Sequence, residues 1–341
     1  MILAGDIGGT KTTLALFASR GESPGFDRDS GILETYDSRA FAGFDTILCD
    51  FLDRHRPQLR AGCIGIAGPV RENRCTATNL PWTLDGGDLA RSLGLAELVL
   101  LNDLEAAGYG IDVLRADEIA VLQTGSPKAT GNRAVIAAGT GLGEAGLFWD
   151  GAAYRPFATE GGHADFAPAG EREVDLLRFL EREYGHVSWE RVVSGPGLVD
   201  LYRYLRQSGE IALAGEPPEI SAEMQRGDPA NVISQHAASG KSALCARTLE
   251  LFAKLYAAEA GNLALKTMAT GGLYIGGGIA SKNLRFMQSE SFIESFRAKG
   301  RMRPLLEAIP VRILLNEQTA LLGAACRATE SLGQGSGRVT P

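Results

Sequence analysis

Two stretches of the chain share one pattern: an apolar run, a glycine-rich turn and a second apolar run. The first reads AGDIGGTKTTLALF (residues 4–17), and the second reads IAAGTGLGEAGLF (residues 136–148). Each predicts two β-strands joined by a tight turn, because apolar runs flank the glycines on both sides. The repeated pattern indicates two structurally similar halves, which limits the possible folds more than any other feature.

Strand-like and helix-like stretches alternate along the rest of the chain. FDTILCDFLDRH (44–55) has apolar residues at helical spacing, and AGCIGIAGPV (61–70) is typical of a buried strand. VRILLNEQTALLGAACRATESL (311–332) reads as a strand and a closing helix, whereas the polar SRGESPGFDRDSG (19–31) is expected to be a loop. The alternation predicts an α/β protein with a mixed sheet, in which ligands bind beyond the carboxyl ends of strands.

Length and charge narrow the class of protein. A chain of 341 residues suggests one large domain or two medium ones. The net charge of −7 argues against non-specific binding to nucleic acid or to an anionic membrane surface. No apolar stretch is long enough to span a bilayer, and no secretion signal is seen at the N-terminus, so a cytoplasmic location is expected.

The cysteines and histidines show no metal-binding pattern. The five cysteines are scattered and form no CxxC pair, and the four histidines lack ligand spacing. We therefore expect buried free thiols and no zinc site.

Three glycine turns stand near the ends of predicted strands, and they are candidates for binding a nucleotide. Gly8-Gly9-Thr10 and Gly139-Thr140-Gly141-Leu142-Gly143 could point backbone N–H groups at phosphate oxygens. Gly276-Gly277-Gly278 would let an adenine or ribose lie against bare backbone. The first turn is neither a Walker loop (GxxxxGK[ST]) nor a GxGxxG fingerprint, and one glycine turn alone is usually only a turn. Their joint occurrence favours a nucleotide site.

Two charged residues of the first turn have alternative roles. Asp6 either caps the turn through backbone N–H groups or holds Mg²⁺ through water. Lys11 either neutralises phosphate charge or is a solvated hairpin residue.

Asp103 follows the buried strand LVLLN, where a carboxylate is costly unless it is paired or functional. It could begin the next helix as an N-cap, or it could be the general base that accepts a proton from a substrate hydroxyl. Both readings can hold for the pair, with either Asn102 or Asp103 providing the cap.

The stretch TEGGHADFAP places Glu160 and His163 around a Gly-Gly bend. The bend is either a polar turn with a lone histidine, or a carboxylate and an imidazole aimed at neighbouring sugar hydroxyls. Glu190 in SWERVVSGPG reads locally as an exposed charge.

Seven blocks together resemble the bacterial-type glucokinases, which belong to the hexokinase and actin-like ATPase superfamily. These are GDIGGTKTTLALF, TNLPW, LLNDLEAAG, AAGTGLGEAGL, EGGHADFAP, GHVSWERVVSGPGLVDLYR and GGLYIGGGIASKN, in the order of the family and from residue 2 to about residue 328. The resemblance implies two actin-like (ribonuclease H-like) α/β domains with mixed sheets, flanked by helices, and an active site in the interdomain cleft. It also implies ATP-dependent phosphorylation of the 6-hydroxyl of glucose.

The resemblance assigns roles to the candidate residues. Asp103 is the implied general base. The implied glucose ligands are Asn79, Asn102, Asp103, Glu160, His163 and Glu190. The implied ATP-binding residues are Gly5, Asp6, Ile7, Gly8, Gly9, Thr10, Lys11, Gly139, Thr140, Gly141, Gly143, Gly276, Gly277 and Gly278, with Mg²⁺ near Asp6 through water.

The related ROK sugar kinases and repressors differ in two respects. They carry a cysteine-rich zinc segment after the EGGH histidine, whereas HADFAPAGEREVDLLRFLEREYG has no cysteine. The repressors also carry a DNA-binding segment before the first phosphate turn, for which this chain has no room before Gly5. Another hexose or amino-sugar kinase, or a sugar-sensing regulator without turnover, remains an alternative.

The polar, turn-rich stretch at 112–132 marks the expected change of module. We expect a small domain of residues 1–112 plus 316–330, a large domain of residues 113–315 and a disordered tail at 331–341. By likeness to the family, a homodimer is also expected.

Overall fold

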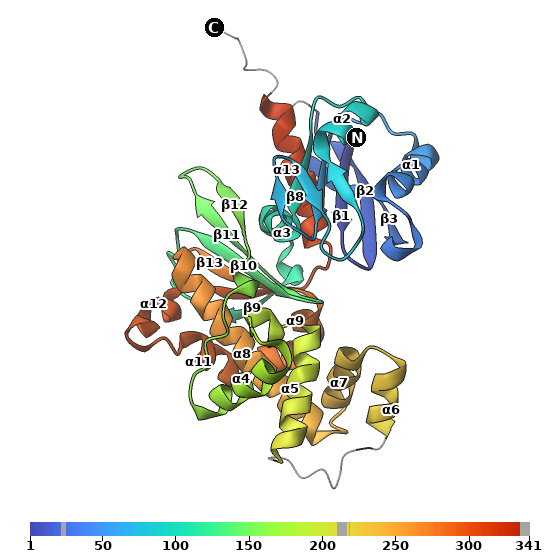
Figure 1. The fold of residues 1–341 in the computed structure, drawn as a ribbon. Helices are drawn as coiled ribbons and strands as arrows, with labels where there is room; N and C mark the ends of the chain where they lie inside the picture. The colour runs from blue at the N-terminus through green and yellow to red at the C-terminus, as the bar shows by residue number, and fades with distance from the viewer. Residues whose placement is uncertain (22–24, 210–216, 218, 335–341) are drawn as a thin grey trace. The chain divides into compact units, whose positions relative to one another are not determined.

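A computed structural model describes residues 1–21, 25–209, 217 and 219–334. The chain divides into two compact units, each with its own sheet (Figure 1). Unit 1 contains Met1–Glu118, Asp150–Ala158 and the segment from Asn316, and unit 2 contains Ile119–Trp149 and Thr159–Leu315.

Unit 1 is built on a five-stranded sheet of order β3-β2-β1-β4-β8. Strands β1 and β2 form the expected antiparallel hairpin, β3 continues it, and β4 and β8 run parallel to β1. The strands are β1 (Ile2–Ile7), β2 (Lys11–Ser19), β3 (Phe26–Asp37), β4 (Ala61–Ile66) and β8 (Leu98–Asn102). A small sheet holds β5 (Val70–Arg71), β6 (Arg74–Thr76) and β7 (Thr83–Asp85).

Both faces of the five-stranded sheet are covered, because side chains of β1 alternate between two apolar clusters. Leu3 and Ile7 pack on the side of helix α1 (Phe44–His55), whereas Ile2 and Ala4 pack with helix α13 (Thr319–Gln334). Figure 1 shows α13 in red beside the blue sheet. The remaining helices of eight or more residues are α2 (Gly86–Leu93) and α3 (Asp103–Gly110).

Unit 2 repeats the strand arrangement of unit 1, but different helices cover its sheet. Within this unit the strands have the order β11-β10-β13-β14-β9, in which β10 and β11 form an antiparallel hairpin and β13 runs parallel to β10. The strands are β9 (Ile119–Gln123), β10 (Arg133–Ala138), β11 (Leu142–Trp149), β13 (Gly272–Gly276) and β14 (Val311–Leu314). A further strand, β12 (Tyr154–Thr159), falls almost entirely in the Asp150–Ala158 segment of unit 1. The expected likeness between the two halves is therefore found in strand order and direction.

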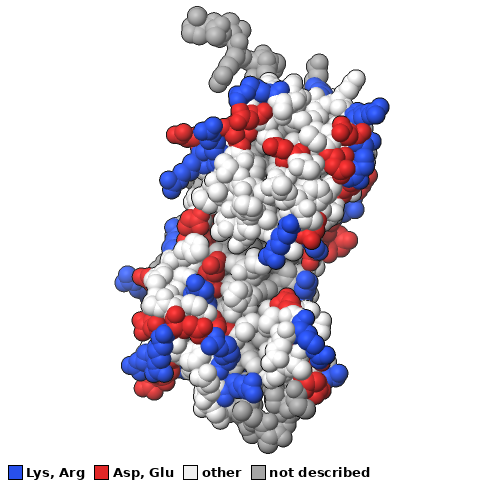
Figure 2. Space-filling model, turned by 45° about the vertical axis from the view of Figure 1, so that its right-hand side comes forward, with Lys and Arg blue, Asp and Glu red and all other residues white. Residues whose placement is uncertain are grey.

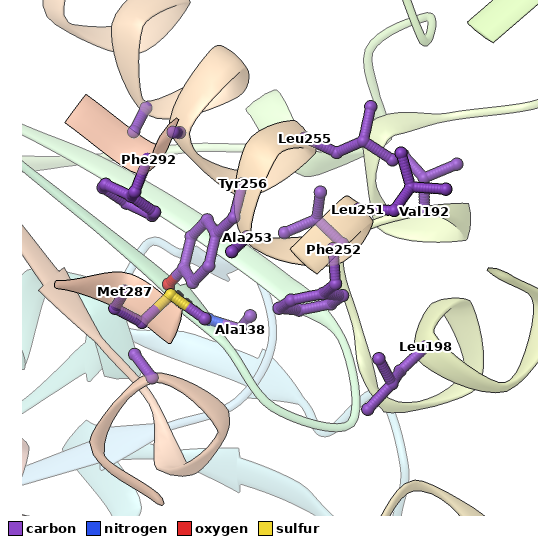
Figure 3. Packing of buried hydrophobic residues seen from close by; sticks show 14 of the residues in the cluster. Ala138, Val192, Leu198, Leu251, Phe252, Ala253, Leu255, Tyr256, Met287 and Phe292 are labelled. Atoms are coloured by element: carbon purple, nitrogen blue, oxygen red, sulfur yellow. Dashed lines mark hydrogen bonds between the residues drawn. The ribbon is translucent and has the colours of Figure 1, made fainter. Parts of the chain in front are cut away.

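Helix α8 (Ala243–Thr267) is the core of unit 2. It packs against β10 and against several helices, and Phe252 and Tyr256 are completely buried beside Phe292 and Met287 (Figure 3). The other helices are α4 (Glu171–Tyr184), α5 (Gly195–Ser208), α6 (Glu219–Arg226), α7 (Pro229–Ala238), α9 (Gly278–Lys282), α10 (Leu284–Met287), α11 (Glu290–Arg297) and α12 (Arg303–Ala308).

Three expectations from the sequence need correction. Residues Phe26–Gly31, expected to be a loop, belong to β3, and of the cysteines expected to be buried, Cys49 on α1 is exposed. Helix α13 continues to Gln334, four residues into the stretch expected to be disordered. The rest of that expected tail, residues 335–341, lies outside the described residues.

Candidate active site

The first glycine turn joins β1 to β2. The amide of Gly8 donates to the carbonyl of Lys11 (2.9 Å) and closes the turn. Ser38 supports it from outside, since its hydroxyl donates to the carbonyl of Gly8 (3.0 Å) and its amide donates to the carbonyl of Thr10 (2.9 Å). These bonds hold the turn without Asp6 as a cap.

The carboxyl group of Asp6 is therefore available for another partner. Burial raises its pKa from 3.8 to about 6, and no hydrogen bond of this side chain is found among the described residues. A desolvated carboxylate beside a turn of backbone N–H groups suits a hydrated Mg²⁺ ion, since Mg²⁺ usually keeps several waters.

The other residues of the first segment differ in their surroundings. Ile7 is buried in the core, and a Cβ at Gly5 would lie 2.6 Å from the side chain of Ile64, so both contribute to packing. A Cβ at Gly9 would lie 2.8 Å from the Cβ of Asn79, which places Asn79 directly on the turn. Lys11 is exposed at the start of β2.

The carboxyl ends of three parallel strands meet at one edge of the sheet in unit 1. In the register of the sheet, Ile7 of β1 is paired with Ile66 of β4, and Ile66 is paired with Asn102 of β8. The segments that follow these strands carry the glycine turn and Asp103. The topology thus brings the phosphate candidates and the implied base to one edge, as expected for an α/β sheet.

Asn102, and not Asp103, is the N-cap of α3. The Asn102 Oδ1 atom accepts from the amide of Leu104 (2.9 Å), and Glu105 Oε2 accepts from the amide of Asn102 (3.1 Å), which completes a capping box. Asn102 Nδ2 also donates to the carbonyl of Gly68 (3.2 Å). Asp103 is the first residue of the helix, where its Oδ1 atom accepts from the amide of Leu104 (3.0 Å).

Three predicted sugar ligands converge in unit 2. His163 Nε2 lies 3.9 Å from Glu160 Oε2, and His163 Nδ1 lies 3.9 Å from Glu190 Oε1. Glu190 Oε2 accepts from the amide of Leu142 (2.9 Å), so this carboxylate is fixed against the second glycine turn. Glu190 is thus not the plain exposed charge that its local pattern suggests, and its backbone carbonyl is held by Ser194 Oγ (2.7 Å).

The second and third glycine turns are tied together by Tyr256 of α8. Its hydroxyl accepts from the amide of Ala138 (3.0 Å), the bond drawn in Figure 3, and it lies within donating distance of the carbonyls of Ile136 (3.2 Å) and Gly276 (3.1 Å). Gly277 has φ +82°, and a Cβ there would overlap the backbone of Ala138. Only glycine allows this approach of β10 and β13 at their ends.

A cavity of about 800 Å³ opens beside these turns, wholly within unit 2. The size is within the range of small-ligand pockets. Its lining combines apolar side chains with the first residues of α5 and α7, where helix N–H groups can bind anions. The lining residues are Gly139, Thr140, Tyr184, Gly195, Pro196, Leu198, Val199, Asp200, Asp228, Pro229, Ala230, Asn231, Ser234, Gly278, Ile279, Lys282 and Asn283.

Only three of these lining residues, Gly139, Thr140 and Gly278, were among the predicted nucleotide ligands. No role for the start of α7 is predicted from the sequence, although Asp228 followed by Pro229 is a signal for the start of a helix. The Asp228 side chain accepts from the amide of Ala230 (3.0 Å). That α7 faces the same cavity as the glycine turns depends on packing between distant segments.

The described residues contain neither a candidate metal cluster nor a helix that could span a membrane. No group of three or more His, Cys, Asp or Glu side chains there could hold a metal ion. None of the helices described is both long and apolar enough to cross a membrane. On the face shown in Figure 2, basic and acidic side chains are interspersed.

Comparison with known proteins decides the family. The family model described as Glucokinase matches residues 3–331. The chain belongs to the glucokinase family. It is 44% identical over 340 residues to the glucokinase of Trichormus variabilis and 43% identical over 339 residues to that of Nostoc punctiforme, in each case over 95% of this chain and 98% of the relative.

Solved glucokinase structures share the fold. The crystal structure of glucokinase from an Antarctic psychrotroph has a TM-score of 0.79 and 28% identity, over 96% of this chain and 98% of that chain. A ROK family glucokinase from Streptomyces griseus, at 22% identity, shares the fold with a TM-score of 0.64, over 96% of this chain and 99% of that chain.

The family prediction, the actin-like α/β fold and the class of ATP-dependent hexose phosphotransferase are thus confirmed. The roles of individual residues, the domain boundaries, the cleft location and the homodimer stay predictions.

Proposed function

We propose that this chain transfers the γ-phosphoryl group of ATP to the 6-hydroxyl of glucose, giving glucose 6-phosphate and ADP. The observation that carries the proposal is the cluster of Glu160, His163 and Glu190 beside the second glycine turn, in a chain of the glucokinase family. Carboxylates that accept hydrogen bonds and an imidazole suit a ligand with many hydroxyls and little apolar surface.

ATP occupies the cavity of unit 2 in this proposal. The apolar walls from Pro196, Val199 and Ile279 suit a flat base, and the N–H group of Thr140 suits a phosphate oxygen. The amide of Gly139 donates instead to the carbonyl of Gly141 (2.9 Å) and closes the turn. The cavity also supports ATP over polyphosphate as donor, because polyphosphate has no group to fill an apolar pocket. Mg²⁺ would be held through water by Asp6, and when bound it neutralises phosphate charge.

Asp103 acts as the general base and accepts the proton of the 6-hydroxyl. The capping box formed by Asn102 and Glu105 supports this role, because Asn102 and not Asp103 is the N-cap of the helix. Asn79 and Asn102 contribute amide groups to the sugar. Phosphoryl transfer needs alignment and charge neutralisation more than covalent help from the protein.

The test is an assay for glucose 6-phosphate with ATP, comparing the unaltered chain with Asp103→Ala. We expect glucose binding to persist in the variant while kcat falls by about three to four orders of magnitude, within the range of general-base effects. Asp45→Asn, at an exposed aspartate of α1 in the same unit, is the control and should keep full activity. An unchanged kcat in Asp103→Ala would remove the base assignment.

The assay also separates the alternatives. Comparing kcat/KM for glucose, mannose, fructose and N-acetylglucosamine distinguishes a glucokinase from another sugar kinase. ADP and polyphosphate in place of ATP test the donor. Glucose binding without turnover by the unaltered chain would indicate a sugar sensor.

A further inference from the structure

Two acidic side chains lie buried together in unit 2, outside the residues with assigned roles. Glu144 of β11 is 2% exposed and Glu259 of α8 is 0% exposed. They interact across the contact between the sheet and α8. Two carboxylates in a dry interior repel each other, so such a pair is stable when it shares one proton.

The neighbours of the pair show which carboxyl carries the proton. Glu259 accepts from Asn262 Nδ2 (2.7 Å) and pairs with Lys266 Nζ (3.3 Å). Glu144 Oε1, by contrast, is buried without a donor among the described residues, and the Glu144 side chain hydrogen-bonds to that of Glu259. Burial, followed by the charge of Glu259, raises the pKa of Glu144 to about 8. Burial also raises the pKa of Glu259, but its bonds from Asn262 and Lys266 favour the charged form there, so Glu259 is the anion of the pair and Glu144 the neutral acid.

Glu144 also supports the turn that presents two proposed sugar ligands. A Cβ at Gly161 would overlap Glu144 Oε2, so the backbone between Glu160 and His163 rests on this carboxyl group. Thr159 Oγ1 donates to the backbone carbonyl of Glu144 (3.0 Å). The turn therefore contacts both the side chain and the main chain of Glu144.

We infer that Glu144 is a positioning residue: in its neutral form it supports the turn at residues 159–163, and its ionisation displaces that turn and weakens glucose binding. The inference rests on the proposed function. The physical reason is that an ionised Glu144 is buried beside the Glu259 charge while its Oε2 atom lies against the backbone of Gly161, so a movement that relieves the charge acts on this turn.

Other charged and titratable groups lie around the pair. On α8, the charge of Lys266 lowers the pKa of Glu144, and the charge of Glu144 raises the pKa of Tyr256, after the larger effect of burial. Lys299 Nζ donates to Asn262 Oδ1 (2.6 Å). Burial lowers the pKa of Lys299, and the charges of Glu259 and of Glu173 in α4 partly oppose this effect. On the turn itself are Glu160 and His163, with Glu190 beside them; both Glu160 and His163 are more than half exposed.

The first experiment measures KM for glucose and kcat across a pH series from about 6 to 9.5, the range that brackets a pKa near 8. We expect KM for glucose to rise about three- to tenfold through pH 8 in the unaltered chain, with KM for ATP nearly constant. Glu144→Gln mimics the neutral acid and should keep KM for glucose flat. Glu250→Gln, at an exposed glutamate of α8, is the matched control and should retain the rise.

Glu259→Gln is the second variant, and it keeps the inference testable if Glu144→Gln does not fold. Removing the neighbouring negative charge should lower the pKa of Glu144, so the rise in KM should begin at lower pH. If Glu144→Gln and Glu259→Gln both keep the pH profile of the unaltered chain, the inference is overturned.

Hydrogen exchange of the peptide covering residues 159–163 gives a readout that needs no turnover. At pH 9 this peptide should exchange faster in the unaltered chain than in Glu144→Gln, and at pH 6.5 the two should agree. Equal exchange at both pH values would contradict the inference. Failure of the unaltered chain to phosphorylate glucose at neutral pH would instead remove the proposed function and leave this exchange comparison to decide the role of Glu144.

Discussion

At the scale of single residues, several side chains of the candidate site combine a structural bond with a proposed contact to substrate. Glu190 is the clearest case, because one carboxylate oxygen accepts from the amide of Leu142 and the other faces His163. Loss of this side chain would leave a backbone donor of the second glycine turn without its partner, as well as removing a proposed sugar ligand.

Glu190→Ala should therefore reduce kcat/KM for glucose by at least about thirtyfold, since two interactions of roughly 1–3 kcal/mol are lost together. Glu190→Gln keeps an acceptor for the Leu142 amide and should cost less than Glu190→Ala. Steady-state kinetics with both variants checks this order. Equal effects would mean that the bond to the turn contributes nothing.

At Asp6, the proposed Mg²⁺ site needs the ionised carboxylate, whereas the stability of the folded chain favours the neutral form. The pKa of Asp6 is raised by burial to about 6, so its ionised form destabilises the folded chain. The stability contributed by the neutral form is complete below the unfolded value of 3.8 and is lost as pH rises through about 6.

Asp6→Asn should thus raise the free energy of unfolding at pH 7 by about 1–3 kcal/mol in the absence of nucleotide, while kcat falls. The gain should disappear at pH 3.5, where both forms are neutral. Thermal unfolding at the two pH values, together with activity at pH 7, tests both parts. A variant that is less stable at pH 7 would contradict the assignment of burial as the dominant effect.

At the scale of elements, α8 determines how the glycine turns of unit 2 are held. The Tyr256 hydroxyl lies at the ends of both β10 and β13, and its ring packs with Phe252 and Phe292 (Figure 3). The helix therefore fixes the spacing of two strands whose following turns line the cavity.

Tyr256→Phe keeps the ring but leaves the amide of Ala138 without its acceptor. We expect a loss of about 1–3 kcal/mol in the free energy of unfolding and a KM for ATP raised more than the KM for glucose. Thr248→Val is the control, because Thr248 is a buried residue of the same helix whose hydroxyl donates within that helix to the carbonyl of Leu244 (2.8 Å). Equal changes in KM for ATP in the two variants would argue against a role for Tyr256 in the nucleotide site.

Elements also show where local patterns mislead. Helix α1 lies at residues 44–55, as its spacing predicts, because its apolar side chains Phe44, Ile47, Leu48 and Phe51 form one buried stripe. The first half of β3 was predicted as a loop because FDRDSG is polar and ends in glycine. It is a strand since β2 provides the hydrogen bonds, and its place at the edge of the sheet leaves many side chains exposed.

At the scale of the whole molecule, the two units repeat one topology but differ in what covers their sheets. Each has a hairpin with a glycine turn and a parallel strand beside it. In unit 2, the helices α5 and α7 add a cavity next to that turn. Nucleotide binding is therefore expected to affect the units unequally.

A non-hydrolysable ATP analogue should slow hydrogen exchange at the starts of α5 and α7, at residues 195–199 and 229–234, by at least about tenfold, since binding must be broken before these amides open. Helix α2 in unit 1 should be unchanged and serves as the internal control. Protection that is absent from α5 and α7 would place the nucleotide elsewhere.

The sequence by itself determined both hairpins, the main helices, the family and most of the residues proposed to bind substrate. These depend on local periodicity, on glycine at turns, and on short motifs that can be recognised in the sequence without knowledge of the fold. Only the tertiary structure decided that Glu190 bonds the second glycine turn, that Asn79 lies on Gly9, and that Glu144 is buried with Glu259 beneath Gly161. Each of these contacts joins elements far apart along the chain, and their approach is set by the packing of the whole core, which no local pattern encodes.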